Sequence, residues 1–198
     1  MAKRVLEGAE EVEVADRRAL RDWLAAHRGR ARGVWLVTGK RASGAYVPYE
    51  EIVRECLAWG WVDSLTRAKD ETRSMLWISP RKPGSNWSRV NKAHVAALEA
   101  EGAMQAPGRA AVERAKADGT WTALDAVEDG VVPEDLAAAL GDLRGVWDGW
   151  PRSVRRGALE VLLNARRPET RAAKVAAIVR AARDGERPFQ WRGRAARA

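Results

Sequence analysis

The chain has 198 residues, of which 46% are hydrophobic and 31% are charged. This length allows one compact domain or two small ones, and this balance is that of a globular protein, which excludes a large multidomain enzyme and a disordered chain. The net charge of +8, carried mostly by arginine, favours phosphates, nucleic acid or an acidic ligand as partners, although GC-biased coding accounts for the same composition.

Helices and short strands are predicted to alternate in the N-terminal half. Leu20, Trp23 and Leu24 recur at helical spacing within residues 16–27, and Asp16 is available as the N-cap. Residues 33–38 are β-branched and aromatic, which is typical of a strand, whereas residues 48–59 begin with proline and acids, which is typical of a helix. Residues 61–66 and 74–79 are predicted to form an antiparallel hairpin.

Proline and glycine positions predict a helical second half, with helices at 87–101, 107–118, 133–140, 152–165 and 169–183. We therefore expect an α+β fold, in which a small, mainly antiparallel sheet in the N-terminal half packs with a helical C-terminal half. We expect one compact domain over 1–198, with an α/β part at about 16–85, a helical part at about 86–189 and flexible ends at 1–12 and 192–198.

No window approaches 18 consecutive apolar residues, and the N-terminal stretch lacks the apolar region of a secretory signal. We therefore expect no membrane span and a cytoplasmic location. The single cysteine, Cys56, cannot form an internal disulfide, and the chain has no Cys/His cluster. The sequence thus predicts no metal site and no cofactor.

Three stretches are similar to those of a known family. They are Trp59-Gly-Trp-Val-Asp-Ser64, Ser79-Pro-Arg-Lys-Pro-Gly-Ser-Asn-Trp-Ser-Arg-Val-Asn91 and Ala115-Lys-Ala-Asp-Gly-Thr-Trp121. On these, and over about residues 22–189, the chain resembles the YdeI/OmpD-associated, or bacteriocin-protection, family. The resemblance implies a role in stress or antimicrobial protection, and it specifies neither a reaction nor catalytic residues.

The loop at 80–84 has the chemistry of an anion site. It carries two cations, Arg81 and Lys82, and it leads into a helix predicted to begin near Ser85 or Asn86. The free N–H groups and the positive end of the dipole at a helix start favour an anion. The alternative is structural, with Ser85 or Ser88 as the helix cap and Arg81 paired to Asp63.

Helical spacing places Trp87 and Asn91 on one side of that helix, and strand alternation sends Trp61 and Asp63 to one face. A buried Trp87 beside an Asn91 that satisfies backbone groups is the alternative. Our hypothesis is that one tryptophan-lined cleft binds a ligand through the following residues: Trp59, Trp61, Asp63, Arg81, Lys82, Asn86, Trp87, Ser88 and Asn91.

The sequence leaves open whether the protein is an enzyme. Asp63 and His94 are the acid/base candidates, because burial against tryptophan raises a carboxyl pKa and histidine titrates near neutrality. Cys56 lies in an apolar helix and is predicted to be an inert, buried thiol. No phosphate-binding loop, dinucleotide fingerprint or hydrolase elbow is present.

The leading hypothesis is a cytoplasmic binding protein that sequesters an amphipathic or anionic small molecule or peptide between tryptophans and a basic loop. The first alternative is a small enzyme that modifies such a compound with Asp63 or His94. The second is nucleic-acid binding, in which indoles stack on bases and phosphates contact the following cations: Arg81, Lys82, Arg89 and the tail residues Arg187, Arg192, Arg194 and Arg197.

Overall fold

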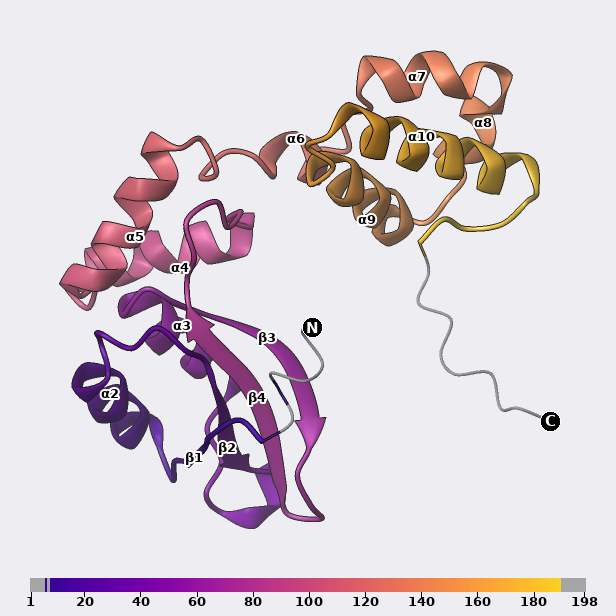
Figure 1. Ribbon diagram of the computed structural model, residues 1–198. Coiled ribbons are helices and arrows are strands. Elements are labelled where there is room, and N and C mark those ends of the chain that lie inside the picture. Colours follow the sequence, from indigo (N-terminus) through magenta and orange to yellow (C-terminus); the bar gives the residue numbers. More distant parts are fainter. Residues whose placement is uncertain (1–5, 7, 190–198) are drawn as a thin grey trace. The chain divides into compact units, whose positions relative to one another are not determined.

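The computed structural model describes residue 6 and residues 8–189 (Figure 1). The chain divides into two compact units, unit 1 (Met1–Trp121) and unit 2 (Thr122–Ala198), and each has hydrophobic clusters of its own. Of the predicted flexible ends, residues 1–5, 7 and 192–198 lie outside the described residues, as do the tail arginines Arg192, Arg194 and Arg197. The prediction of one compact domain stays a prediction.

Unit 1 alternates strands and helices before it ends in two helices. Its elements are β1 (Glu11–Glu13), α2 (Arg17–Ala26), β2 (Val34–Gly39), the 3-10 turn η1 (Arg41–Ser43), α3 (Tyr49–Ala58), β3 (Trp61–Ala68), β4 (Arg73–Pro80), α4 (Arg89–Ala100) and α5 (Ala106–Ala117). The strand order is β1-β2-β4-β3, with β1 parallel to β2 and the other pairs antiparallel. The predicted α+β class, the mainly antiparallel sheet and the β3–β4 hairpin are confirmed.

Residues 11 and 12, which were predicted to belong to the flexible N-terminal end, lie in strand β1. Glu11 and Val12 pair with Trp35 and Leu36 of β2. The three-residue Glu-Val-Glu segment is too short to show the apolar alternation that predicts a strand. It is recognised as a strand only because it pairs with β2.

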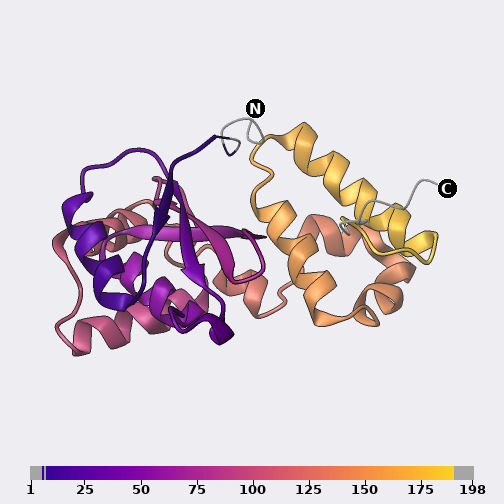
Figure 2. The ribbon, with the colours of Figure 1, turned by 90° about the horizontal axis from the view of Figure 1, so that it is seen from below.

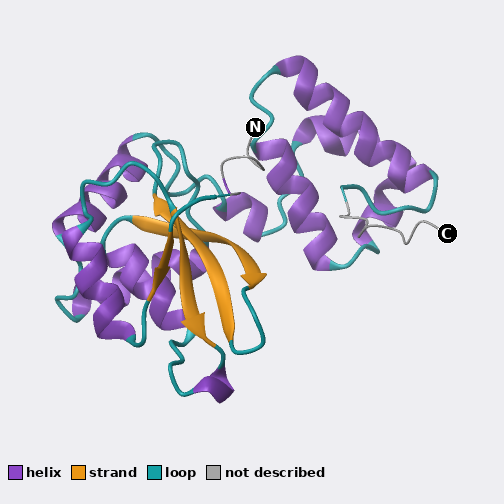
Figure 3. Cartoon of the chain, turned by 60° about the horizontal axis from the view of Figure 1, so that its bottom comes forward, coloured by secondary structure: helices purple, strands orange, loops and turns teal. Residues whose placement is uncertain are grey.

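Three layers make up unit 1. Helices α2 and α3 cover one face of the sheet (Figure 3). Leu20 of α2, Ile52 of α3 and Leu36 of β2 share the hydrophobic cluster there. The other side of α3 supplies Val53 and Leu57 to a second cluster with α4 and α5. Because α4 and α5 bury their apolar faces on α3, they belong to unit 1, although the predicted helical part begins at about residue 86.

Side-chain caps explain where helices α2 and α4 begin. The Asp16 carboxylate accepts the Ala19 N–H at 2.8 Å and starts α2 as predicted. The helix predicted near Ser85 or Asn86 begins instead at Arg89, because the Ser88 hydroxyl accepts the Asn91 N–H at 3.2 Å. The loop cations therefore lie several residues before the start of this helix.

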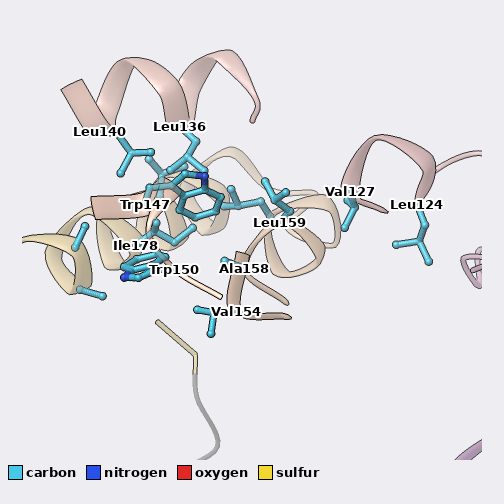
Figure 4. Packing of buried hydrophobic residues seen from close by; sticks show 14 residues of the cluster. Leu124, Val127, Leu136, Leu140, Trp147, Trp150, Val154, Ala158, Leu159 and Ile178 are labelled. Atoms are coloured by element: carbon cyan, nitrogen blue, oxygen red, sulfur yellow. The ribbon is translucent and has the colours of Figure 1, made fainter. Parts of the chain in front are cut away.

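The described part of unit 2 consists of helices joined by turns and loops. It contains α6 (Asp125–Glu128), α7 (Glu134–Leu140), η2 (Gly141–Leu143), α8 (Arg144–Asp148), α9 (Arg152–Leu163) and α10 (Pro168–Arg183). Helix α10 packs against both α7 and α9 (Figure 2). Figure 4 shows Leu136 and Leu140 of α7 directed towards Trp147, with Leu159 and Ile178 closing the core. None of the described helices combines the length and the apolar character that crossing a membrane requires.

Candidate functional site

A buried arginine forms the centre of the predicted basic loop. Only 6% of Arg81 is exposed, and its guanidinium carbon lies 3.8 Å from the centre of the Trp87 ring. One guanidinium nitrogen donates to the Asn86 carbonyl at 2.9 Å, whereas Nε finds no acceptor in the described part of the chain. Burial lowers the pKa of Arg81 to about 10, against the opposing effect of the Asp63 charge. Arg81, Asn86 and Trp87 therefore contact one another, and their role in ligand binding stays a prediction.

Asp63 interacts with a tyrosine and forms no ion pair with Arg81. The hydroxyl of Tyr49, which lies at the start of α3, donates to Asp63 Oδ2 at 2.6 Å. Burial and this hydrogen bond raise the pKa of Tyr49 to about 12. Arg81 makes no ion pair within the described residues. The alternative prediction, in which Arg81 pairs with Asp63, is therefore wrong.

The two tryptophans expected to line one cleft are core residues. Trp61 and Trp87 are each 1% exposed, and they belong to different hydrophobic clusters. Trp61 packs edge-on against Trp23 of α2 at 5.5 Å, while Trp87 packs against Trp121 at 5.1 Å. Trp59 is half-buried and contacts both clusters. The predicted common cleft is therefore wrong, because each indole fills a different layer of unit 1.

The remaining predicted residues have structural or peripheral positions. Ser88 caps α4 by accepting the N–H of Asn91, which is half-buried, and His94 is also half-buried on the same helix. The cavity between the basic loop and Trp87 measures about 10 Å³, which leaves room for about one water molecule. Cys56 is buried as predicted, and burial raises the pKa of its thiol.

A cavity that was not predicted lies beside the sheet of unit 1. It measures about 890 Å³, in the range of small-molecule sites. The segment 8–10, the loop 30–33, β3 and the end of β4 contribute its walls, and Lys82 reaches it from the basic loop. Lys82 thus joins the predicted loop to a cavity that is large enough for a ligand.

Trp77 forms the aromatic wall of this cavity. Strand alternation sends its neighbours Leu76 and Ile78 into the core beneath α2 and α3, so Trp77 lies on the opposite face. Its ring packs edge-on against Trp35 at 5.3 Å, and Trp35 Nε1 donates to the carbonyl of Leu6, another lining residue. Trp35 therefore contacts two parts of the cavity wall, the Trp77 ring and the backbone at Leu6.

Gly33 provides the space that Trp77 occupies. A Cβ atom at this position would lie 2.6 Å from the Trp77 ring and 2.6 Å from the Ile78 carbonyl. Real Cβ atoms do not approach other atoms this closely, so a larger residue at 33 would displace the indole or the strand.

The charges around the cavity are predominantly positive. Arg30 forms an ion pair with Glu10, and its hydrogen bond holds the pKa of Glu10 below its usual range. The side chains of Arg32 and Lys82 have no ion-pair partner within the described chain. An indole wall beside unpaired cations suits a ligand that is apolar at one end and anionic at the other.

Residues 12–111, half of the chain, match the family model described as "Domain of unknown function (DUF8412)". The chain belongs to the DUF8412 family. The cavity-lining residues of the loop 30–33, β3, β4 and the basic loop lie within the DUF8412 match, whereas Leu6 and residues 8–10 precede it.

A second model, described as "Bacteriocin-protection, YdeI or OmpD-Associated", matches residues 129–185, in unit 2. This confirms the predicted family resemblance over these residues. The stretches at 59–64 and 79–91, on which the resemblance was based, lie instead within the DUF8412 match, and the stretch at 115–121 lies outside both. No curated protein and no solved structure gives a significant match to the chain.

The sequence contained part of the signal for the cavity beside the sheet. The predicted strand at 74–79 alternates Leu76 and Ile78 with Trp77 and Ser79, which is enough to separate two faces. What the sequence lacks is the register that sets Trp35 opposite Trp77, and the approach of the loop 30–33 to the same face.

Proposed function

We propose that the protein binds an amphipathic anion in the cavity beside the sheet, with the apolar part of the ligand against Trp77 and its anionic group near Arg32 and Lys82. The main support is that a cavity of about 890 Å³ has two cations without an ion-pair partner in the described chain, Arg32 and Lys82, on its wall. The proposal keeps the ligand class predicted from the sequence and replaces the residues that bind it.

The chemistry of the wall favours a planar or branched apolar body. Trp77 and Leu65 supply apolar surface, and 48% of Leu65 is exposed. Ser64 and Ser79 also line the cavity, and a serine hydroxyl is a neutral hydrogen-bond donor and acceptor. Ligands of this kind gain affinity from apolar burial and orientation from a few polar groups.

Isothermal titration calorimetry with naphthalene-2-sulfonate tests the proposal, because this probe joins an apolar ring to a fixed anion. We expect saturable binding that weakens by at least about tenfold in the Arg32→Ala/Lys82→Ala variant and in Trp77→Ala. The matched cation 2-naphthylmethylammonium should bind at least about tenfold more weakly than the sulfonate to the unchanged protein.

The control removes two arginines elsewhere in unit 1. Arg18→Ala/Arg28→Ala lowers the net charge by the same amount, and neither residue lines the cavity. Equal affinity for the two probes, or sulfonate affinity that survives the loss of Arg32 and Lys82, contradicts the proposal. The circular dichroism spectrum and the melting temperature of each variant establish that the fold is retained.

Two further measurements on the same samples address the alternatives. Mass spectrometry of the ligand after incubation detects turnover, for which Asp63 and His94 stay the predicted acid/base residues. Titration with duplex and single-stranded DNA at two salt concentrations tests nucleic-acid binding, whose phosphate contacts require affinity to fall steeply with salt.

A further inference from the structure

A groove of about 710 Å³ follows helix α10 in unit 2. Its lining residues on α10 recur every three or four positions from Pro168 to Arg183, and Asp135 and Ala139 of α7 form the opposite wall. The helix has 16 residues and is about 24 Å long, so the groove extends over about four turns.

The floor of the groove is apolar. Ala172 and Ala176 are exposed there and Val179 is half-buried, whereas Val175 beside them is buried. The core of unit 2 takes up Val175 and the fully buried Ile178 of α10, and Val179 packs against the edge of this core. The two alanines and the exposed part of Val179 therefore form apolar surface outside the core, and this surface faces the groove.

The two ends of the groove differ in charge. At one end Arg171 donates two hydrogen bonds to the Asp135 carboxylate, at 2.6 and 2.8 Å, so this cation is neutralised. At the other end Arg180 and Arg183 have no carboxylate partner within the described residues. The helix dipole accounts for cations in a last turn, but not for the apolar groove that leads to them.

We propose that this groove docks an acidic amphipathic helix of a partner protein. The apolar side of that helix lies on Val179 and on the exposed Ala172 and Ala176, whose small side chains allow close approach. Its carboxylates pair with Arg180 and Arg183. Charge complementarity selects the partner, because the groove has unpaired cations at one end and the protein has a net charge of +8. This inference concerns unit 2 and is independent of the ligand site proposed in unit 1.

Fluorescence anisotropy with a labelled peptide of about 16 residues tests the inference on the full chain. The probe is a designed helix with leucine at spacings of three and four and glutamate elsewhere. We expect it to bind at least about tenfold more tightly than the same helix with lysine in place of glutamate, and than an acidic peptide of equal composition that prolines prevent from folding.

Two variants locate the binding on the groove. Arg180→Glu/Arg183→Glu should weaken binding of the acidic helix by at least about tenfold, and Ala176→Phe should do so by filling the floor. Arg18→Glu/Arg28→Glu changes the net charge equally in unit 1 and should leave the affinity unchanged. Melting temperatures separate a blocked groove from an unfolded one.

Several outcomes overturn the inference. Undiminished binding in Arg180→Glu/Arg183→Glu excludes charge selection, and equal affinity for the lysine helix excludes an acidic partner. Binding to phosphatidylglycerol vesicles tests the alternative partner, because an anionic membrane also binds an apolar surface beside arginines. Binding to vesicles that requires Arg180 and Arg183, without binding to the acidic helix, assigns the groove to a membrane surface and refutes the inference.

Discussion

Glu55 shows how a single buried charge organises unit 1. It lies on α3 with 3% of its surface exposed, and it accepts hydrogen bonds from Arg17 at 2.5 Å and from Arg21 at 2.7 Å, both on α2. Burial by itself raises a carboxyl pKa, but these two arginines hold the pKa of Glu55 below its ordinary value. The carboxylate thereby joins α2 to α3 over the sheet.

We expect Glu55→Gln to lower the free energy of unfolding by about 1–3 kcal/mol, because the amide keeps the shape but loses the charge that both arginines face. Arg17 and Arg21 are partly exposed and regain water, which keeps the loss below that of a fully buried pair. Urea denaturation measures the change. Glu113→Gln is the control, since its ion pair with Lys116 is exposed and should contribute less than about 0.5 kcal/mol. Equal effects of the two substitutions would contradict this role of Glu55.

At the scale of elements, the contact between α3 and α5 depends on one glycine. A Cβ atom at Gly108 of α5 would lie 2.2 Å from the Ala58 carbonyl and 2.7 Å from the Leu57 carbonyl. Both neighbours are backbone atoms at the end of α3, which cannot rotate away as a side chain does. The close approach of the two helices therefore requires glycine at this position.

We expect Gly108→Ala to destabilise unit 1 by about 1–3 kcal/mol, because the added methyl group separates α5 from α3. The same substitution at Gly157 of α9 meets no atom within 4 Å and should stabilise the helix by about 0.5–1 kcal/mol. Thermal unfolding of both variants distinguishes packing from helix propensity. A stabilised Gly108→Ala protein would show that the helices separate without cost.

At the scale of the whole molecule, each unit contains a carboxylate whose charged form is favoured by folding. Glu55 is one, and Asp135 in unit 2 is the other, since its hydrogen bonds with Arg171 hold its pKa below its usual value. A lowered pKa contributes stability that is complete above the unfolded value and is lost as the pH falls through the folded value. The ordinary values are 4.5 for Glu55 and 3.8 for Asp135.

The urea midpoint should therefore be insensitive to these two groups above about pH 5 and should fall as the solution is acidified below about pH 4. Glu55→Gln should make the fall shallower, because glutamine does not titrate. Chemical denaturation at pH 7, 5, 4 and 3 tests this. A midpoint that stays constant down to pH 3, or an equal acid sensitivity in Glu55→Gln, would show that these ion pairs do not set the acid stability.

The sequence by itself determined the local elements of this protein, because their signals lie within a few residues. Asp16 capped α2 as predicted, and alternation placed a hairpin at β3 and β4. The same reasoning missed β1, whose Glu-Val-Glu segment becomes a strand only beside β2.

Only the tertiary structure decided where the indoles lie and where a ligand fits. Trp61 and Trp87 have equally suggestive neighbours in the sequence, but they fill separate core layers, whereas Trp77 borders the large cavity. The loop 30–33 and Lys82 reach that cavity through the register of β2 on β4. Whether a side chain is buried depends on which elements, distant in the sequence, pack against it. Residue spacing predicts only the face of a helix or strand on which the side chain lies.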